Sequence, residues 1–360
     1  MKKILLGTSA LALAGASAGK AEAATWDLDW GGYFEASVGY ADVDGPSGTD
    51  FDGVDVLQDA EIQFTPSITL DNGLTFGVDI QLEGNTGGDQ IDESFAFVKG
   101  SFGQVLIGSE NSAGYKMSYG APDVTWVGVN SGSLSAFIPF SGGGRGSDVF
   151  RGTLGSSFVE VGRNNDAQRI TYFTPRFAGF QLGASYARDA LEDSSAAVDI
   201  DAAGTLNNIF DVGANYVNSF GAFDLAVSGR YGTADREGSN DDPYVWAAGL
   251  NVGYAGFTVG GSYAESEDSG AQDGEFFDVG IAYETGPWGV SFTYANGENV
   301  DNENVSEDET LEQYIAGVSY KLGPGVTAGV YGAYVDFDED NNSADDIDGW
   351  VIGTGFKLAF

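Results

Sequence analysis

Apolar and polar residues alternate along most of this 360-residue chain with the period of two that is typical of β-strands. In residues 58–70 the even-numbered positions from Ala60 to Leu70 are apolar, and the odd-numbered positions from Asp59 to Thr69 are polar. The triplet Asp71-Asn72-Gly73 follows and predicts a tight turn, because Asn and Gly tolerate positive φ. Leu74 then begins the next alternating run. This pattern predicts an all-β protein.

Repeated runs of this kind predict 16 strands, which begin near Trp30, Val56, Leu74, Glu93, Gly103, Arg169, Gly179, Phe210, Gly221, Val245, Gly256, Glu275, Trp288, Leu311, Val326 and Gly349. Short connections such as Ala255-Gly256 alternate strictly with long ones such as residues 187–209. Long and short loops at opposite ends are typical of bacterial outer-membrane barrels. The alternative is a soluble β-sandwich or propeller, but no repeat of blade length is evident. We therefore predict a transmembrane antiparallel 16-stranded β-barrel.

One stretch, Ser109 to Gln168, interrupts the strand pattern for about 60 residues, whereas ordinary loops rarely exceed about 12–15. It carries enough apolar surface to pack against another element, from Trp126, Phe137, Ile138, Phe140, Phe150, Phe158 and Val159. We expect it to fold into the lumen of the barrel as a long third loop and to narrow the passage.

Residues 1–23 have the features of a signal peptide. Lys2 and Lys3 form a basic start, an apolar run follows, and residues 21–23 fit an A-x-A cleavage motif, although a cut after Ala18 is also possible. The apolar run is too short to span a membrane. We therefore expect export through the periplasm, with residues 24–360 as a single barrel domain.

The composition excludes several kinds of chemistry. The chain has no Cys and no His, so disulfides, thiolate metal sites and Ser–His nucleophilic pairs are excluded, and we predict that it is not an enzyme. Its formal charge is −39, and because the signal segment carries a net +2, the remainder is near −41. A polyanion of this kind attracts cations and does not bind nucleic acid.

The last strand carries an aromatic-rich face, Trp350, Ile352, Thr354, Phe356, Leu358 and Phe360, and the sequence stops on Phe360. With the stretch from Phe97 to Gly108, the long third loop and the even strand count, the chain resembles the Gram-negative general porins, which are trimeric and 16-stranded, and most closely those of alphaproteobacteria. The resemblance implies a water-filled channel in the outer membrane for passive diffusion of small hydrophilic solutes and ions. It also implies a homotrimer, contact with lipid and lipopolysaccharide, and recognition of Phe356, Leu358 and Phe360 by the barrel assembly machinery.

The resemblance further implies a constriction between acids on the third loop and basic residues on the wall. The predicted constriction residues are Glu110, Asp123, Arg145, Asp148, Arg151, Glu160 and Arg163, and Lys116 adds a further loop cation. The predicted lumen-wall residues are Glu35, Asp59, Glu61, Asp79, Asp211, Asp278, Arg230 and Lys321. The chain has Gly108-Ser109 where many relatives have Gly-Arg, and its inward acids outnumber its inward basic residues. We therefore expect a preference for cations.

The sequence also bears on bound ligands and on two alternative functions. No cofactor is expected, although carboxylates of the outer loops, such as Asp336, Asp338 and Asp340, could bind Ca²⁺ or Mg²⁺ loosely. These three match the start of an EF-hand loop, but Asn341 and Ile347 replace its required Gly and Glu. The alternatives to a general porin are a substrate-specific channel, for example for sugars, and an adhesive or structural barrel. A row of aromatic side chains along the lumen, here called an aromatic slide, would favour the sugar channel. The inward-facing candidates for such a row are Tyr33, Phe276 and Tyr331.

Overall fold

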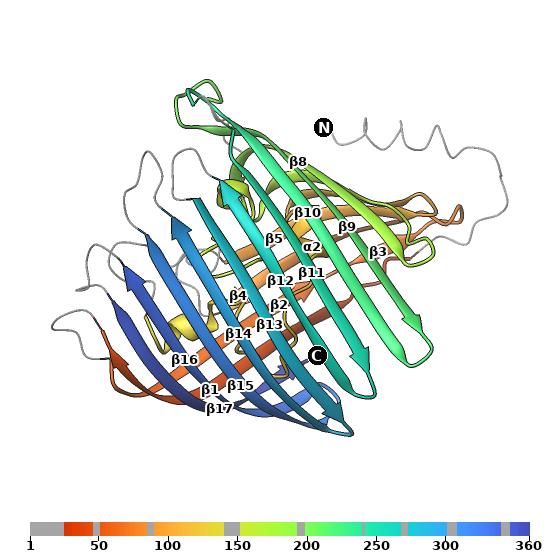
Figure 1. The fold of residues 1–360 in the computed structure, drawn as a ribbon. Coiled ribbons are helices and arrows are strands. Elements are labelled where there is room, and N and C mark those ends of the chain that lie inside the picture. The colour runs from red at the N-terminus through yellow and green to blue at the C-terminus, as the bar shows by residue number, and fades with distance from the viewer. Residues whose placement is uncertain are drawn as a thin grey trace.

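A closed ring of antiparallel strands forms the body of the protein (Figure 1). The computed structural model describes residues 25–45, 51–84, 90–139, 152–192, 199–239, 242–267, 273–300, 308–339 and 346–360. The strands are β1 (Trp30–Asp44), β2 (Gly53–Phe64), β3 (Ser67–Thr69), β4 (Thr75–Gly84), β5 (Ile91–Gly100), β6 (Gly103–Ser109), β7 (Ala167–Phe173), β8 (Phe180–Glu192), β9 (Leu206–Phe220), β10 (Phe223–Arg236), β11 (Tyr244–Tyr254), β12 (Phe257–Glu267), β13 (Asp273–Thr285), β14 (Trp288–Val300), β15 (Glu309–Gly323), β16 (Val326–Glu339) and β17 (Ile347–Ala359). β1 pairs with both β2 and β17, so the sheet has no open edge.

Two of these strands, β2 and β3, form a single pass across the barrel. Both pair with β4, and only Thr65 and Pro66 separate them. Proline has no N–H to donate, so it interrupts the ladder of hydrogen bonds. The 17 strands of the sheet therefore make 16 passes, which confirms the predicted 16-stranded barrel.

Tight turns join the strands at one end of the barrel. In the turn at residues 71–73, Gly73 adopts a φ of +82° and Leu70 N–H donates to the carbonyl of Leu74 (2.8 Å). The connections between β11 and β12 and between β13 and β14 are each two residues long. These hairpins match the short connections that the sequence predicts.

The outer face carries two bands of aromatic side chains separated by exposed aliphatic residues. Near the tight turns the ring pairs are Trp30–Phe64, Phe180–Tyr216, Phe223–Tyr254, Phe257–Tyr283 and Trp288–Tyr320. Toward the other end they are Tyr40–Trp350, Tyr186–Phe210, Trp246–Tyr263 and Tyr294–Tyr314. Val252, Ile281 and Ile352 are exposed between the bands. Aromatic girdles around an apolar belt are the lipid-facing pattern of outer-membrane barrels.

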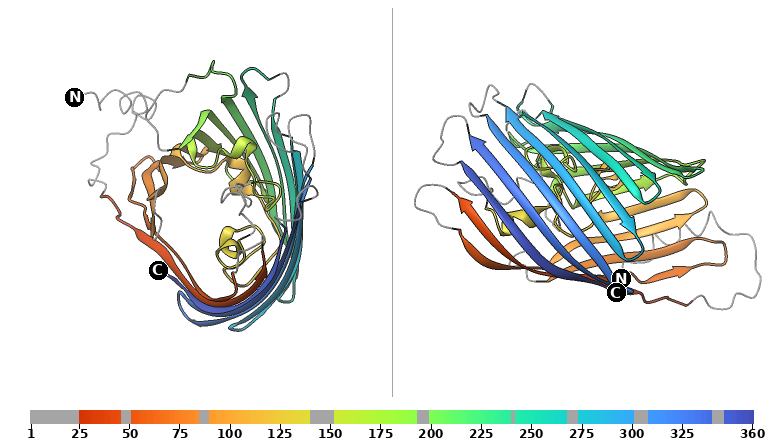
Figure 2. Two further views of the ribbon diagram at one scale, coloured as in Figure 1. Left: turned by 90° about the vertical axis from the view of Figure 1, so that its left-hand side faces the viewer. Right: turned by 60° about the horizontal axis from the view of Figure 1, so that its bottom comes forward.

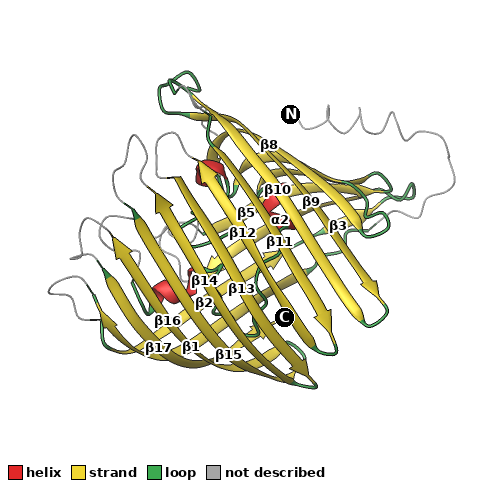
Figure 3. Ribbon diagram, viewed as in Figure 1, coloured by secondary structure: helices red, strands yellow, loops and turns green. Residues whose placement is uncertain are grey.

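The segments 110–139 and 152–166, together called here the inward loop, lie inside the ring of strands. It contains α2 (Ala113–Met117) and the short 3₁₀ helices η1 (Gly132–Ala136) and η3 (Val161–Arg163). Figure 3 shows these helices within the barrel, and the end-on view of Figure 2 shows the loop against the green and blue strands. The predicted insertion of the third loop is thus confirmed, with Ser109 and Gln168 belonging to the flanking strands. In the described part of the chain, no helix is long and apolar enough to cross a membrane.

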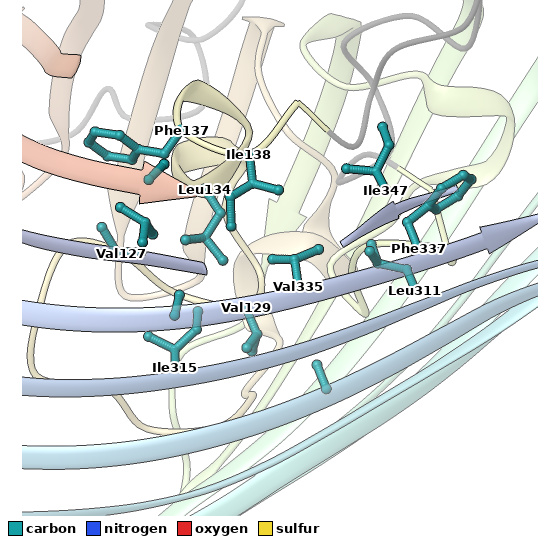
Figure 4. Close-up of a cluster of buried hydrophobic side chains, with 14 of the residues drawn as sticks. Val127, Val129, Leu134, Phe137, Ile138, Leu311, Ile315, Val335, Phe337 and Ile347 are labelled. Atoms are coloured by element: carbon teal, nitrogen blue, oxygen red, sulfur yellow. The ribbon is translucent and has the colours of Figure 1, made fainter. Parts of the chain in front are cut away.

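A dry hydrophobic cluster fixes the middle of the inward loop to the wall (Figure 4). Leu134, Phe137 and Ile138 of the loop are almost completely buried against Leu311, Val335, Phe337, Ile347 and Val351 of β15, β16 and β17. Fully burying such a side chain contributes roughly 1.5–3 kcal/mol. This side of the lumen is therefore filled by packed side chains of the loop and the wall.

Candidate functional site

Backbone N–H groups of the inward loop donate hydrogen bonds to short polar side chains on the inner wall. The pairs are Ala113 to Ser185 (2.7 Å), Gly114 to Asp211 (2.5 Å), Tyr119 to Ser228 (3.0 Å), Ala121 to Asp278 (2.6 Å) and Val124 to Ser291 (3.2 Å). The acceptors come from β8, β9, β10, β13 and β14, so the loop crosses much of the wall at one level. Each bond also satisfies a donor that would otherwise be costly to bury.

Glycines on the inner wall let the loop backbone approach closely. A Cβ on Gly249 of β11 would lie 1.8 Å from the carbonyl oxygen of Tyr119, and one on Gly297 of β14 would lie 2.0 Å from that of Leu154. Only glycine fits at these positions. Sequence reasoning did not identify this contact surface, and its signal is the run of inward Ser and Gly residues on neighbouring strands.

Three of the predicted lumen-wall residues lie beneath the loop. Asp211 and Arg230 form an ion pair of 2.6 Å with both side chains almost fully buried. Asp278 is 3% exposed and accepts hydrogen bonds from Asn130 Nδ2 (2.9 Å) and from Ser262 Oγ, in addition to that from Ala121. These residues point inward, as the alternation predicts, but they bind the loop and do not line open water.

Glu160, a predicted constriction residue, connects the end of the inward loop to its beginning. It is 4% exposed, accepts a hydrogen bond from Ser112 N–H (2.6 Å) and lies 3.6 Å from Arg169. Arg163 is exposed beside it, with a φ of 55°. The predicted residues Arg145, Asp148 and Arg151 lie outside the described residues.

The other four predicted lumen-wall acids lie on β1, β2 and β4, beside two acids of β4 and β5 that were not predicted. We call the six together the acidic wall, and it consists of Glu35, Asp59, Glu61, Asp79, Glu83 and Glu93. Glu35 and Asp59 are direct cross-strand partners, as are Glu61 and Glu83. Glu83 and Glu93 were missed as candidates, although each lies close to a strand end in the alternating pattern. The inward loop reaches this wall at two places, because Asn111 Nδ2 donates to Glu93 of β5 (2.7 Å) and Trp126 Nε1 donates to Ser37 of β1 (2.7 Å). Glu35, Glu61 and Glu93 are buried side chains of the inner face.

One cation of the inward loop faces this acidic wall. Lys116 on α2 lies 2.7 Å from the carboxylate of Glu110, and its ammonium is 5.7 Å from the ring centroid of Phe95 on β5. Glu110 is fully buried. Burial raises the pKa of Glu110 to about 8; the Lys116 ammonium opposes this shift, and the Glu93 carboxylate adds to it. This pair places a charge at the edge of the lumen that depends on pH.

Two further cations lie near the tight-turn ends of the last strands. Lys321 of β15 forms an exposed ion pair with Glu284 (2.7 Å), and Lys357 of β17 pairs with Glu35 (2.5 Å). Asp123 of the inward loop is exposed on the same side of the barrel and shares a cavity with both lysines. Lys357 thus contacts one member of the acidic wall, Glu35, whereas Lys321 pairs with Glu284 outside it.

Neither a metal centre nor an aromatic slide is evident among the described residues. No group of three Asp or Glu residues there could hold a metal ion, and residues 340–345 of the acidic last loop lie outside the description. Phe276 and Tyr331 are 0% and 1% exposed, because both belong to the dry cluster. They therefore do not support the reading of a sugar channel.

The predicted assembly residues end the strand that closes the barrel. Phe356 and Phe360 are exposed on the outer face at 42% and 70%, and Leu358 is partly buried between them. Gly32 N–H donates to the carbonyl of Phe360 (3.1 Å), which joins the two terminal strands.

The sequence was compared with models of known protein families. Residues 8–350 match the family described as Gram-negative porin. This chain belongs to the Gram-negative porin family. The family and the 16-stranded barrel place it in the outer membrane as a channel-forming porin. The match favours a channel over an enzyme.

Solved structures of several outer-membrane proteins share the fold at low sequence identity. The anion-selective porin from Comamonas acidovorans is 16% identical, with a TM-score of 0.63 over 93% of this chain and 100% of that one. OmpT of Vibrio cholerae, in its trimer form, is 15% identical, with a TM-score of 0.61 over 93% and 100%. OmpF of Salmonella typhi, in complex with daunomycin, is 14% identical, with a TM-score of 0.59 over 92% and 97%. No curated protein matches this sequence significantly.

Proposed function

We propose that this porin is a passive diffusion channel for small hydrophilic solutes and ions that prefers cations. The observation that carries the proposal is the acidic wall on β1, β2, β4 and β5. Lys116 of the inward loop lies beside this wall, with its ammonium 2.7 Å from the carboxylate of Glu110.

The preference follows from the field of fixed charges in a narrow lumen. Glu61 and Glu83 are cross-strand neighbours, so their carboxylates act on the same part of the passage. The Debye length is about 10 Å at 0.1 M salt, so fixed charges on the wall act over the passage beside them. A wall of one sign raises the local concentration of counter-ions, here cations. The Comamonas porin is anion-selective, but at 16% identity it shares the fold alone.

The test of this mechanism is ion selectivity after neutralisation of the acidic wall. In the double variant Glu61→Gln, Glu83→Gln, we expect the K⁺/Cl⁻ permeability ratio to fall at least twofold at 0.1 M KCl. Asp235→Asn, which neutralises an exposed acid near the end of β10, is the control and should leave the ratio unchanged. An unchanged ratio in the double variant would contradict the proposed role of this wall.

We also propose that the protein forms a homotrimer. The outward positions of β1 include the small residues Gly32 and Ala36, which suit close packing between barrels. The Vibrio cholerae structure with the same fold is described as a trimer. Light scattering of the detergent-solubilised protein tests this directly: a mass of three chains supports the proposal, and a mass of one chain refutes it.

A further inference from the structure

The inner wall between the inward loop and the tight turns carries a hollow on strands β9 to β12. It is a cavity of about 490 Å³ that lies on two neighbouring rows of cross-strand partners. The row nearer the turns is Ser219, Asp224, Gly253 and Thr258, and the row above it is Val217, Ala226, Asn251 and Gly260. The two glycines and the alanine have little or no side chain, so they form a low floor between the polar residues.

The inward loop crosses the next row of the wall, so the cavity lies beside the loop and not beneath it. Tyr119 N–H donates to Ser228 Oγ (3.0 Å), and Ser228 is the cross-strand partner of Gly249. Ser228 is two residues from Ala226, which is about 7 Å along a strand. Among the described residues, none of the inward loop lines the cavity. The cavity is therefore a feature of the wall at the tight-turn end of the lumen.

Asp224 supplies the one charge among the described residues that line the cavity. Its side chain is exposed, and its Oδ1 accepts a hydrogen bond from Ser219 Oγ (2.6 Å), which orients the carboxylate. Its Oδ2 lies toward Gly253, where a Cβ would be 3.6 Å away, and accepts no hydrogen bond from the described residues. Arg176 donates to Asn215 in the row of Ser228 (2.8 Å) and does not line the cavity.

Two neutral acceptors lie across the floor from this carboxylate. Asn251 packs over Gly260, and its Oδ1 is buried without a hydrogen-bond partner among the described residues. The Thr258 hydroxyl makes no hydrogen bond within the described part of the chain either. Neighbouring strands lie about 4.8 Å apart, so about 10 Å of sheet separates Thr258 from Asp224. Three acceptors, one of them charged, therefore surround a floor of small residues.

These features favour a cation that carries several N–H donors. An anion would meet Asp224 without a basic partner in the lining, and a cation without donors would leave the oxygen of Asn251 unsatisfied. A guanidinium group is planar, carries N–H donors around its edge and pairs with a carboxylate through two parallel hydrogen bonds. The volume of the cavity lies within the range of about 300–1,000 Å³ that is usual for small-molecule sites.

We propose that this cavity binds small solutes with a guanidinium group, which donates to the carboxylate of Asp224 and faces Asn251 and Thr258. The inference rests on the proposed diffusion function, because a solute reaches the cavity through the lumen. It deepens that function by naming a class of cation that is retained at the tight-turn end.

The experiment compares methylguanidinium with two probes that each lack one of its properties. Methylurea carries N–H donors without the charge, and tetramethylammonium carries the charge without donors. Binding to the full mature protein in detergent is measured at equilibrium by saturation-transfer NMR at 50 mM salt, using the methyl protons of each probe. We expect methylguanidinium to bind at least threefold more tightly than either analogue. Equal binding of methylguanidinium and one analogue would overturn the proposal.

Variants identify the groups involved. Asp224→Asn keeps the shape of the side chain but removes its charge, and should weaken methylguanidinium binding at least fivefold. Ala226→Leu keeps every polar group but fills the floor, and should weaken binding at least threefold. Asp235→Asn removes an exposed acid near the other end of β10 and should have no effect. Unchanged binding in both cavity variants would refute the site.

Channel recordings on the same preparations separate this proposal from the proposed function. Binding that depends on Asp224 in a protein that conducts no ions would support the cavity and refute passive diffusion. Open channels in a protein that binds the three probes equally would support diffusion and refute the cavity.

Discussion

The carboxylate of Asp211 lies 2.6 Å from the guanidinium of Arg230, and both side chains are buried beneath the inward loop. Asp211 also accepts a hydrogen bond from Gly114 N–H at the start of α2 (2.5 Å). This one carboxylate therefore joins β9, β10 and the loop. The pair helps to set where the loop lies and therefore how wide the passage is.

Removing Asp211 should destabilise the protein because Arg230 would remain as a buried and uncompensated charge. For Asp211→Ala we expect a loss of about 3–5 kcal/mol in the free energy of unfolding. The measurement is urea unfolding of the refolded barrel in lipid. The double variant Asp211→Ala, Arg230→Met should recover part of the loss. A single variant within about 1 kcal/mol of the wild type would contradict this role.

The carboxyl group of Glu110 should give the channel a pH-dependent selectivity. Its pKa is raised to about 8 by burial, with Lys116 of α2 opposing and Glu93 of β5 reinforcing the shift. Glu110 is therefore mostly protonated at pH 6.5 and mostly ionised at pH 9.5, so cation preference should rise over this interval. Because the folded state retains a proton that the unfolded chain has lost, the same group should lower stability as the pH rises from about 4.5 to about 8.

The zero-current potential measured at both pH values checks the effect on selectivity. Glu110→Gln should abolish the change between pH 6.5 and 9.5, whereas Glu284→Gln, which removes an exposed carboxylate outside this contact, should retain it. The same change in all three proteins would show that other groups cause it.

Gly249 should be needed for the backbone of the inward loop to pack directly against the barrel wall. In Gly249→Ala the new Cβ would lie 1.8 Å from the carbonyl oxygen of Tyr119, so the loop must shift. Overpacking of this kind typically costs about 1–3 kcal/mol. We expect reduced stability and an altered single-channel conductance.

Gly229→Ala is the matched control on the neighbouring strand β10, because its nearest heavy atom would be 3.9 Å away. Its conductance and stability should match those of the wild type. If both variants behave alike, close packing of the inward loop on Gly249 does not determine the conductance or the stability.

The barrel could be predicted from the sequence because its determinants are local. Alternation along residues 58–70 and the turn at 71–73 each depend on a few neighbouring residues, and a strand that alternates incorrectly exposes its polar face to lipid. The insertion of the loop also has a local signal, since its apolar residues occur where no strand can form.

The roles of individual acids could not be predicted in the same way. Glu61 and Asp278 are buried at equivalent inward positions in alternating strands, yet Glu61 accepts a hydrogen bond from Gln63 of its own strand and Asp278 binds Ala121, a residue 157 positions away. The pair of Glu35 and Lys357 joins residues 322 positions apart. Only the closure of the barrel and the path of the loop determine which partner each of these carboxylates meets.

The most direct test of the account is the zero-current potential of single channels in a planar bilayer under a KCl gradient at pH 7. We predict stepwise conductance with a potential displaced toward the equilibrium value for K⁺, because the acidic wall groups six carboxylates on the inner face of four strands. A potential displaced toward the equilibrium value for Cl⁻ would contradict cation preference and would point instead to the lysines at positions 116, 321 and 357 as the charges that govern the channel.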